Sequence, residues 1–242
     1  MKASIFEIIE NSPLTKDVCM MRLCGDTSNI TAPGQFVNIK IDGLYLRRPI
    51  SVCDVNGDEL TIIYKVVGSG TAAMKEMCTG CGLDLLTGLG NGYDLDASGE
   101  KPVLLGGGVG VPPMYLLAKK LISQGRDVRV ILGFNTKDEI FFENEFKTLG
   151  AHTFVTTVDG SYGIKGFATD ALPDDYTYFY TCGPEPMLKA VYKATKTSGE
   201  FSFEQRMGCG FGACMGCSCK TVTGYKRICK DGPVLRKEEI LW

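Results

Sequence analysis

Residues 102–125 read PVLLGGGVGVPPMYLLAKKLISQG, an apolar run followed by a glycine-rich turn and a helical pattern. The run predicts a buried strand, and the pattern after the glycines predicts a helix. Another strand is predicted in RDVRVILGFN at 126–135, followed by a helix in TKDEIFFENEFKTLG at 136–150. A short helix is predicted in GFATDAL at 166–172, and the alternation of helical and strand-like segments continues to residue 199. This alternation predicts a parallel sheet that is covered by helices on both faces.

The segments on either side of this sheet have different patterns. Before it, short runs of strand-forming residues are separated by turn-forming clusters, which predicts an antiparallel barrel. From Glu204 onward the sequence is rich in Gly and Cys. This segment is too short to bury a core of its own, so it needs a cross-link such as a metal cluster to hold its fold. We therefore predict a multi-domain chain: an antiparallel β-barrel at 1–98, an α/β parallel-sheet domain at 99–203 and a small cysteine-rich module at 204–242.

Composition argues against several classes of protein. The 242 residues carry a net charge of −2, which gives no electrostatic basis for binding nucleic acid or an anionic membrane. No apolar run is long enough to span a bilayer, and Glu7 and Glu10 interrupt the stretch where a signal peptide would be apolar. We therefore expect a cytoplasmic protein. In that reducing compartment eleven cysteines indicate metal binding or buried thiols, and a single His argues against His-based metal sites and Ser-His-Asp catalysis.

Four cysteines form the most specific chemical pattern in the chain. Cys209, Cys214 and Cys217 follow the spacing C-x4-C-x2-C, and Cys229 comes after a hairpin-like segment. Three thiolates from one glycine-rich loop and a fourth from a returning strand are typical of a ferredoxin-type iron–sulfur site. Structural zinc stays the alternative, although zinc sites usually pair two short-spaced couples and no second couple surrounds Cys229.

Three further cysteines are candidates for a metal or redox site. Cys219 lies two residues after Cys217, and we predict that it is a buried or near-site thiol and not a ligand. Cys78 and Cys81 form a C-x-x-C pair, which alone could be a redox or metal pair. Nothing nearby supplies further ligands, so we predict a structural role for both in a loop of the barrel.

Two stretches of the barrel segment indicate a bound nucleotide. YLRRPISV at 45–52 combines an Arg, which can clamp a pyrophosphate with its forked donors, and a Ser, which can hydrogen-bond a flavin ring nitrogen. KVVGSGT at 65–71 ends in a Gly-x-Gly-Thr turn, where backbone N–H groups can approach a phosphate. Each feature is weak alone, and their combination predicts a dinucleotide site.

The glycine-rich turn of the α/β segment gives a second nucleotide signal. It follows a strand and opens a helix, as a nucleotide site requires. Pro113 stands where the third Gly of G-x-G-x-x-G belongs, and the next strand ends in Gly133-Phe134-Asn135 without an acidic residue for a ribose. A standard Rossmann dehydrogenase is therefore disfavoured, and helix–strand packing remains an alternative role for the glycines. TCGPEPM at 181–187 follows a later strand, at the sheet edge where ligands bind.

The order RRPIS, G-x-G-T, GGGVGVPP and CGPEPM resembles the ferredoxin–NADP reductase superfamily, which pairs an FAD-binding antiparallel barrel with a pyridine-nucleotide domain. The tail EQRMGCGFGACMGCSCK…YKRICKDGPV is similar to that of one family within it, the electron-transfer subunits of type B dihydroorotate dehydrogenases. The resemblance covers essentially the whole chain, and the cysteine tail is its most specific part.

The resemblance implies an oxidoreductase subunit of pyrimidine biosynthesis. A partner subunit would oxidise dihydroorotate to orotate on FMN, and electrons would cross a 2Fe-2S cluster to FAD and leave as hydride to NAD. The implied assembly is a heterotetramer with two copies of each subunit. We expect no catalytic residue in this chain, because it shows no proton-abstracting Cys, Ser or His constellation.

The motifs also imply which residues hold each cofactor. FAD would be bound by Arg48, Pro49, Ile50, Ser51, Lys65, Val66, Val67, Gly70 and Thr71. The NAD side would be lined by Gly107, Gly108, Gly110 and Cys182, and the 2Fe-2S cluster would be held by Cys209, Cys214, Cys217 and Cys229.

Two other functions remain open on the residues alone. One is another flavin and iron–sulfur NAD(P)H reductase subunit, linked to ferredoxin or to a sulfur compound. The other is a zinc-stapled regulator that binds a nucleotide. Without an acidic ribose ligand, the preference for NAD over NADP rests on the resemblance.

Overall fold

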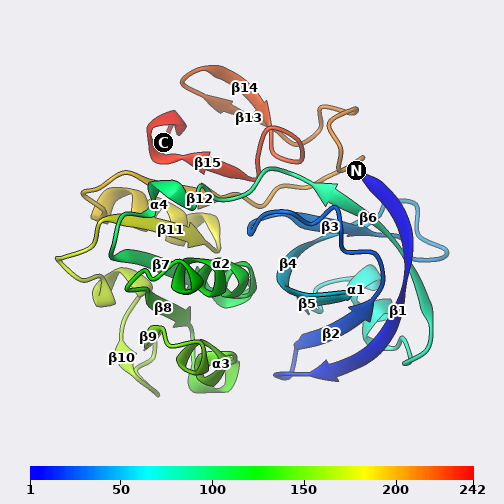
Figure 1. Ribbon diagram of the computed structural model, residues 1–242, viewed down its shortest axis with the longest axis horizontal. Coiled ribbons are helices and arrows are strands. Elements are labelled where there is room, and N and C mark those ends of the chain that lie inside the picture. Colours follow the sequence, from blue (N-terminus) through cyan, green and yellow to red (C-terminus); the bar gives the residue numbers. More distant parts are fainter.

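Six antiparallel strands close into a barrel in the first third of the chain (Figure 1, blue to cyan). The computed structural model describes residues 1–242, and the strands follow each other around the barrel in the order β1-β2-β5-β4-β3-β6. Their bounds are β1 Lys2–Pro13, β2 Val18–Cys24, β3 Phe36–Ile39, β4 Arg48–Asn56, β5 Glu59–Lys65 and β6 Gly82–Leu89. Alternate side chains point inward, so Val37, Ile39 and Val52 are fully buried in the barrel core. One short helix, α1 (Ser69–Lys75), lies between β5 and β6.

A seven-stranded sheet forms the second part of the molecule (Figure 1, green to orange, with β15 in red). Its order is β10-β9-β8-β7-β11-β12-β15, and only β15 runs antiparallel to its neighbour. The strands are β7 Pro102–Gly107, β8 Arg129–Phe134, β9 His152–Thr157, β10 Ile164–Lys165, β11 Tyr178–Cys182, β12 Gly199–Ser202 and β15 Val234–Arg236. The helices are α2 Pro112–Ser123, α3 Glu143–Thr148 and α4 Glu185–Ala194.

The two large parts share one hydrophobic core. Buried residues of α2, among them Met114 and Leu117, pack with Cys53 and Ile63 of the barrel as well as with the sheet. Leu188 of α4 packs in a separate cluster with the opposite face of the sheet. Helices therefore cover both faces, and α2 fixes the barrel against the sheet.

The cysteine-rich segment lies above both parts (Figure 1, orange to red). It contains the antiparallel hairpin of β13 (Ser218–Thr221) and β14 (Gly224–Arg227). The chain then returns to the sheet as β15, which pairs with β12. The segment is thus joined at its two ends to β12 and β15, which pair with each other in the sheet.

The predicted fold class is confirmed, with differences in detail. The segment TKDEIFFENEFKTLG, predicted as one helix, is broken at Phe142, whose φ of 66° is left-handed. A 3-10 turn at Lys137–Glu139 and the short α3 take its place. GFATDAL forms a 3-10 turn at Ala168–Ala171 where a short helix was predicted. None of the helices has the length and apolar character needed to cross a membrane.

Candidate functional site

The RRPIS motif opens β4, beside β3. Ser51 pairs with Phe36 and Pro49 pairs with Asn38. Val52 is buried inside the barrel and Ile50 packs against the same core, so strand alternation places Pro49 and Ser51 on the outer face. Pro49 and Ser51 therefore lie on an outer surface of the barrel, where a planar ring could stack, whereas the side chain of Ile50 points toward the core.

The two arginines of the motif have different surroundings. Arg47 forms a bidentate pair with Asp84, at 3.0 and 3.1 Å, and is held by the barrel itself. Arg48 lies across the start of α1, because a Cβ placed on Gly70 would be only 2.1 Å from its Nε. The structure thus brings Arg48 and Gly70 together from two separate motifs, and the absence of a side chain at Gly70 leaves room for the guanidinium in this position.

The turn before α1 is closed by Thr71. Its Oγ1 accepts hydrogen bonds from the backbone N–H of Val67 at 2.9 Å and of Gly68 at 3.3 Å. These bonds order the predicted Gly-x-Gly-Thr turn without any ligand. The Thr71 hydroxyl therefore shapes the turn, while neighbouring backbone groups remain for a phosphate.

The glycines after β7 have separate reasons to be glycine. A Cβ on Gly110 would lie 2.2 Å from the carbonyl oxygen of Cys182, and one on Gly107 would lie 2.3 Å from Met187 Sδ. Gly110 is therefore required by packing of the turn against the backbone at the end of β11, whereas at Gly107 the flexible side chain of Met187 on α4 fills the space. Gly108 has a φ of 52° and would meet no atom within 4 Å. Of the three predicted glycines, Gly108 is the one with open space beside it.

Predicted FAD and NAD residues meet in a small hollow between the two large parts. Lys65 comes from the barrel and Gly108 from the sheet, and Lys65 Nζ pairs with Asp17 at 2.9 Å. The hollow is lined by Asp17, Val18, Lys65, Gly108, Val109, Phe134, Glu139 and Phe141. A hydride passing between a flavin and a nicotinamide requires such a meeting of the two domains.

Cys182 lies at the end of β11, beside the turn after β7. Burial raises the pKa of its thiol to about 12, although a hydrogen bond with Ser202 opposes that shift. The thiol is therefore neutral at physiological pH and is not a nucleophile.

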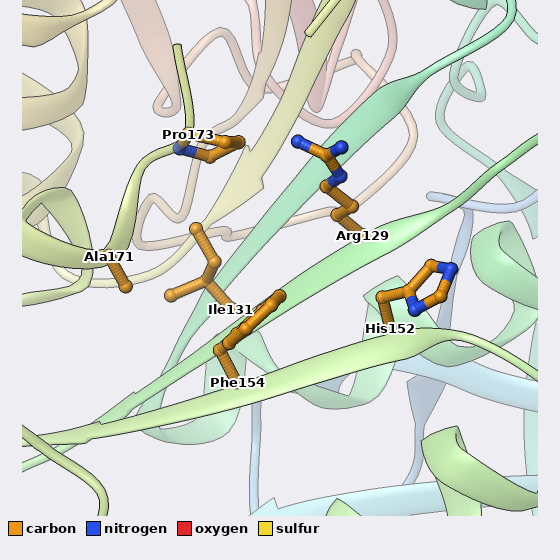
Figure 2. A pocket seen from close by; sticks show the side chains of 6 residues that line it. All are labelled: Arg129, Ile131, His152, Phe154, Ala171 and Pro173. Carbon is orange, nitrogen blue, oxygen red and sulfur yellow. The ribbon is translucent and has the colours of Figure 1, made fainter. Parts of the chain in front are cut away.

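A larger cavity, of about 390 Å³, opens at the beginning of β8 and β9 (Figure 2). It is lined by Arg129, Ile131, His152, Phe154, Ala171 and Pro173. The two polar side chains already have partners, because Arg129 pairs with Asp175 and His152 lies 3.2 Å from Asp127. None of the predicted site residues lines this cavity, which lies away from the carboxyl edge of the sheet.

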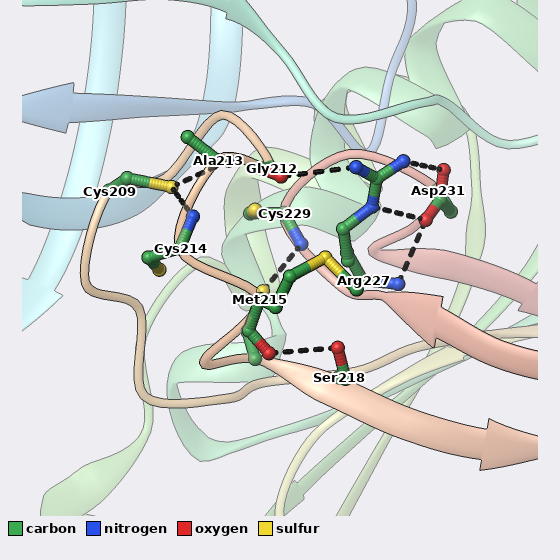
Figure 3. A network of polar contacts seen from close by, with 10 residues as sticks. Cys209, Gly212, Ala213, Cys214, Met215, Ser218, Arg227, Cys229 and Asp231 are labelled. Atoms are coloured by element: carbon green, nitrogen blue, oxygen red, sulfur yellow. Dashed lines mark hydrogen bonds and ion pairs between the residues drawn. The ribbon is translucent and has the colours of Figure 1, made fainter.

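Hydrogen bonds link the four predicted ligand cysteines as two pairs, and Figure 3 shows three of them, Cys209, Cys214 and Cys229. Cys209 Sγ accepts hydrogen bonds from the N–H groups of Ala213, at 3.2 Å, and Cys214, at 3.4 Å. Cys217 Sγ accepts one from the N–H of Cys229 at 3.4 Å, and both of these cysteines are buried.

The two pairs differ electrostatically. Burial opposes ionisation of Cys209, but backbone donors led by Cys214 prevail and lower its pKa to about 6. Burial and the adjacent Cys217 raise the pKa of Cys229 to about 12. Cluster binding must therefore release a proton from Cys229, whereas Cys209 already favours its thiolate form.

The donor set fits a binuclear iron–sulfur cluster. Each iron of a 2Fe-2S cluster takes two thiolates, and the structure supplies one pair from the loop and one that joins the loop to the end of the hairpin. Backbone N–H groups that point at the sulfurs are the donors that stabilise such a cluster. No three Cys, His, Asp or Glu side chains surround a single point. Cys219 lies on β13 opposite Lys226, half-buried beside the site.

An arginine that the sequence analysis did not single out braces this loop (Figure 3). Arg227 Nη1 donates to the carbonyl oxygen of Gly212 at 3.0 Å. Its Nε and Nη2 donate to the carboxylate of Asp231 at 2.9 and 3.1 Å. Arg227 and Asp231 carry opposite charges four residues apart, a spacing in the sequence that can indicate an ion pair. The sequence alone does not distinguish a pair that braces a loop from an ordinary exposed pair.

Barrel, parallel sheet and cysteine loop together define a reductase of the ferredoxin–NADP reductase class. The solved structure of an NADH-dependent reduced ferredoxin-NADP oxidoreductase matches with a TM-score of 0.89 at 29% identity, over 99% of this chain and 90% of that chain. A ferredoxin NADP+ reductase from Neisseria gonorrhoeae, solved with bound FAD and NADP, has the same fold, with a TM-score of 0.69 at 19% identity over 80% of this chain and 90% of that chain.

Sequence relatives narrow the class to one family. Residues 204–241 match the model of the iron–sulfur cluster binding domain of dihydroorotate dehydrogenase B, and residues 104–193 match an oxidoreductase NAD-binding domain. The chain is 42% identical to the dihydroorotate dehydrogenase B (NAD(+)) electron transfer subunit of Geobacillus sp. (strain WCH70), over 100% of this chain and 99% of the relative. It is 44% identical to that of Fusobacterium nucleatum subsp. nucleatum, over 99% of each.

The chain belongs to the family of dihydroorotate dehydrogenase B electron transfer subunits. The predicted family, the oxidoreductase class and the cofactor set of FAD, 2Fe-2S and NAD are confirmed. The residues assigned to each cofactor, and the domain boundaries, stay predictions.

Proposed function

We propose that this chain carries electrons from the FMN of a catalytic partner subunit, where dihydroorotate is oxidised to orotate, to NAD+ in pyrimidine biosynthesis. FAD supplies the conversion between single electrons and hydride, and the cluster supplies single-electron transfer. One observation supports the proposal: the barrel, which carries the predicted FAD residues, contacts both the cysteine loop and the turn after β7. The cysteine loop contacts the barrel beside the RRPIS motif, and the hollow between the domains joins Lys65 to Gly108.

In this proposal each part of the chain has one task. The barrel at 1–98 holds FAD, the sheet domain at 99–203 holds NAD and the segment at 204–242 holds the cluster. The FAD residues are Arg48, Pro49, Ile50, Ser51, Lys65, Val66, Val67, Gly70 and Thr71. The NAD residues are Gly107, Gly108, Gly110 and Cys182, with Gly107 and Gly110 acting through the shape of the turn. The cluster ligands are Cys209, Cys214, Cys217 and Cys229.

The outer side of the cysteine loop is the proposed docking site for the partner. Cys214 is exposed, and beside it the large apolar side chains of Phe211 and Met215 are 42% and 54% exposed. Exposed apolar groups around an electron carrier favour a protein contact there. The complex is a cytoplasmic heterotetramer with two copies of each subunit.

Co-expression with an FMN-containing dihydroorotate dehydrogenase subunit tests the proposal. The purified complex should contain flavin and iron, and dihydroorotate should bleach the flavins and reduce NAD+. A complex in which dihydroorotate never bleaches the flavin would overturn the proposal. A colourless chain that contains zinc would instead favour a zinc-stapled regulator.

A second candidate follows from the structural comparison. The NADH-dependent reduced ferredoxin-NADP oxidoreductase covers 99% of this chain with a TM-score of 0.89, so a ferredoxin-linked reductase would have the same architecture. Reduction of a ferredoxin by the chain with NADH, without any dihydroorotate-dependent activity in the complex, would favour that candidate.

A further inference from the structure

We propose that Asn38 is a positioning residue that holds the cysteine loop against the FAD face of the barrel. This inference rests on the proposed function. Asn38 lies on β3 and is 1% exposed. Its neighbours Val37 and Ile39 point into the barrel, so strand alternation turns Asn38 outward, toward the cysteine loop. There its Nδ2 donates to the carbonyl oxygen of Cys209 at 3.3 Å.

The loop rests directly on this carboxamide. A Cβ on Gly210 would lie 2.3 Å from Asn38 Nδ2, and Gly210 has a φ of 79°. A side chain at position 210 would therefore push the loop away from the barrel. The carbonyl oxygen of Cys209 is an acceptor only, which fixes the orientation of the Asn38 amide with its NH2 group toward the loop.

On its other side, Asn38 is part of the strand pair that carries the FAD motif. It pairs with Pro49 across β3 and β4. Its backbone carbonyl accepts a hydrogen bond from Arg47 Nη1 at 3.2 Å, and Arg47 is held by Asp84. Asn38 therefore connects the backbone of Cys209, a predicted cluster ligand, to β4, the strand that carries predicted flavin residues.

The carboxamide oxygen is the second unusual feature. Asn38 Oδ1 is buried and accepts no hydrogen bond from the protein. Buried polar atoms nearly always have a partner, whether protein, water or ligand. A buried acceptor without a protein partner, between the RRPIS strand and the cysteine loop, is expected where a bound group covers the outer face of the barrel.

The consequence concerns electron transfer between the two carriers. The rate falls steeply as their separation grows, and the potential of a cluster depends on hydrogen bonds and solvent around its sulfurs. By fixing the peptide between Cys209 and Gly210, Asn38 sets both the separation of the loop from the FAD face and the access of water to the gap. Residues that orient ligands in this way typically change activity about 10- to 100-fold when replaced.

Two variants separate positioning from mere stability. Asn38→Leu keeps the size but removes the donor, whereas Asn38→Ser keeps a hydroxyl that can donate. Lys40→Leu is the matched control, because Lys40 follows two residues later on the same side of the strand and is exposed. Iron and flavin contents are measured first. Anaerobic stopped-flow mixing with NADH then follows flavin bleaching and cluster reduction separately, and electron paramagnetic resonance records the reduced cluster.

In Asn38→Leu we expect NADH to bleach the flavin at the wild-type rate, while cluster reduction slows about 10-fold or more and the g-values shift. Asn38→Ser should recover part of the rate, and Lys40→Leu should match wild type. A fully loaded Asn38→Leu chain with wild-type cluster kinetics and spectrum would overturn the inference. If Asn38→Leu keeps FAD but loses iron, restored iron in Asn38→Ser supports the hydrogen bond, and iron loss in both overturns it.

Failure of the proposed function would look different. If NADH does not bleach the flavin of the wild-type chain, or if that chain shows no signal from a reduced cluster, the proposed function and the inference are refuted together. A wild-type chain that behaves as expected beside an unaffected Asn38→Leu chain would refute only the role of Asn38.

Discussion

Glu200 on β12 accepts a hydrogen bond at 2.9 Å from the backbone N–H of Asp94, which lies in the segment between the barrel and the sheet. Glu200 is only 4% exposed, and burial raises the pKa of its carboxyl from 4.5 to about 7, against the effect of the Asp94 N–H. A carboxyl that favours its neutral form therefore anchors the connection between the FAD and NAD domains.

The first prediction concerns pH. Because the folded chain holds this proton more tightly than the unfolded chain, the free energy of unfolding should fall as pH rises from about 4.5 to about 7, and the loss should persist above that. A shift of this size corresponds to about 3 kcal/mol. Glu200→Gln should lose this dependence and exceed wild type in stability at pH 8 but not at pH 4.5. Urea unfolding at pH 4.5 and pH 8 measures the free energy of unfolding of wild type and Glu200→Gln. Equal pH profiles for the two chains would contradict the prediction.

Cys217→Ser should remove the cluster and leave FAD bound, whereas Cys219→Ser should retain both. Cys217 is buried in the inner thiol pair, while Cys219 lies on β13 opposite Lys226. Iron and flavin assays on the two purified variants test the assignment. Loss of iron from Cys219→Ser would mean that the ligand set is wrong.

Arg227→Ala should release iron to a chelator about 10- to 100-fold faster than wild type, because it removes the bond that ties Gly212 to the hairpin. Arg227→Lys keeps the charge but not the forked geometry, so it should rescue only part of the effect. The absorbance of the iron–chelator complex gives the rate. Equal release rates in wild type and Arg227→Ala would show that the brace is unimportant.

Gly110→Ala should destabilise the chain by about 1–3 kcal/mol, because its Cβ would lie 2.2 Å from the carbonyl oxygen of Cys182. The turn or β11 must then move, so NADH binding should weaken as well. Gly108→Ala meets no atom and adds only the strain of a left-handed residue, about 1–2 kcal/mol. Thermal unfolding and NADH titration compare the two variants, and a Gly110→Ala chain that behaves like wild type would contradict the packing role.

Features that repeat along the chain could be predicted from the sequence. Met21 and Leu23 of β2 are fully buried and alternate with the less buried Met20 and Arg22 because one face of the strand meets the core, and the alternation of strands and helices follows from a sheet covered on both faces. The spacing of the first three ligand cysteines is equally local, because a turning loop must converge its thiols over a few residues.

Contacts between distant segments could not be predicted in this way. Asn38 and Cys209 are 171 residues apart, and an Asn in a strand gives no sign of what its side chain will contact. The left-handed Phe142 interrupts a pattern that reads as one helix, because the tertiary packing of its ring overrides local preference. β15 has only three residues, too few to show a period.

β15 also determines the order in which the molecule can be completed. The sheet acquires its seventh strand only after the ribosome has made the whole cysteine segment, because β12 and β15 are neighbours in space and residues 203–233 separate them in the chain. Until then β12 is an open edge, which is the kind of surface that recruits strands from other chains. A chain stopped before residue 234 would therefore contain the whole cysteine segment but leave the edge of β12 unpaired.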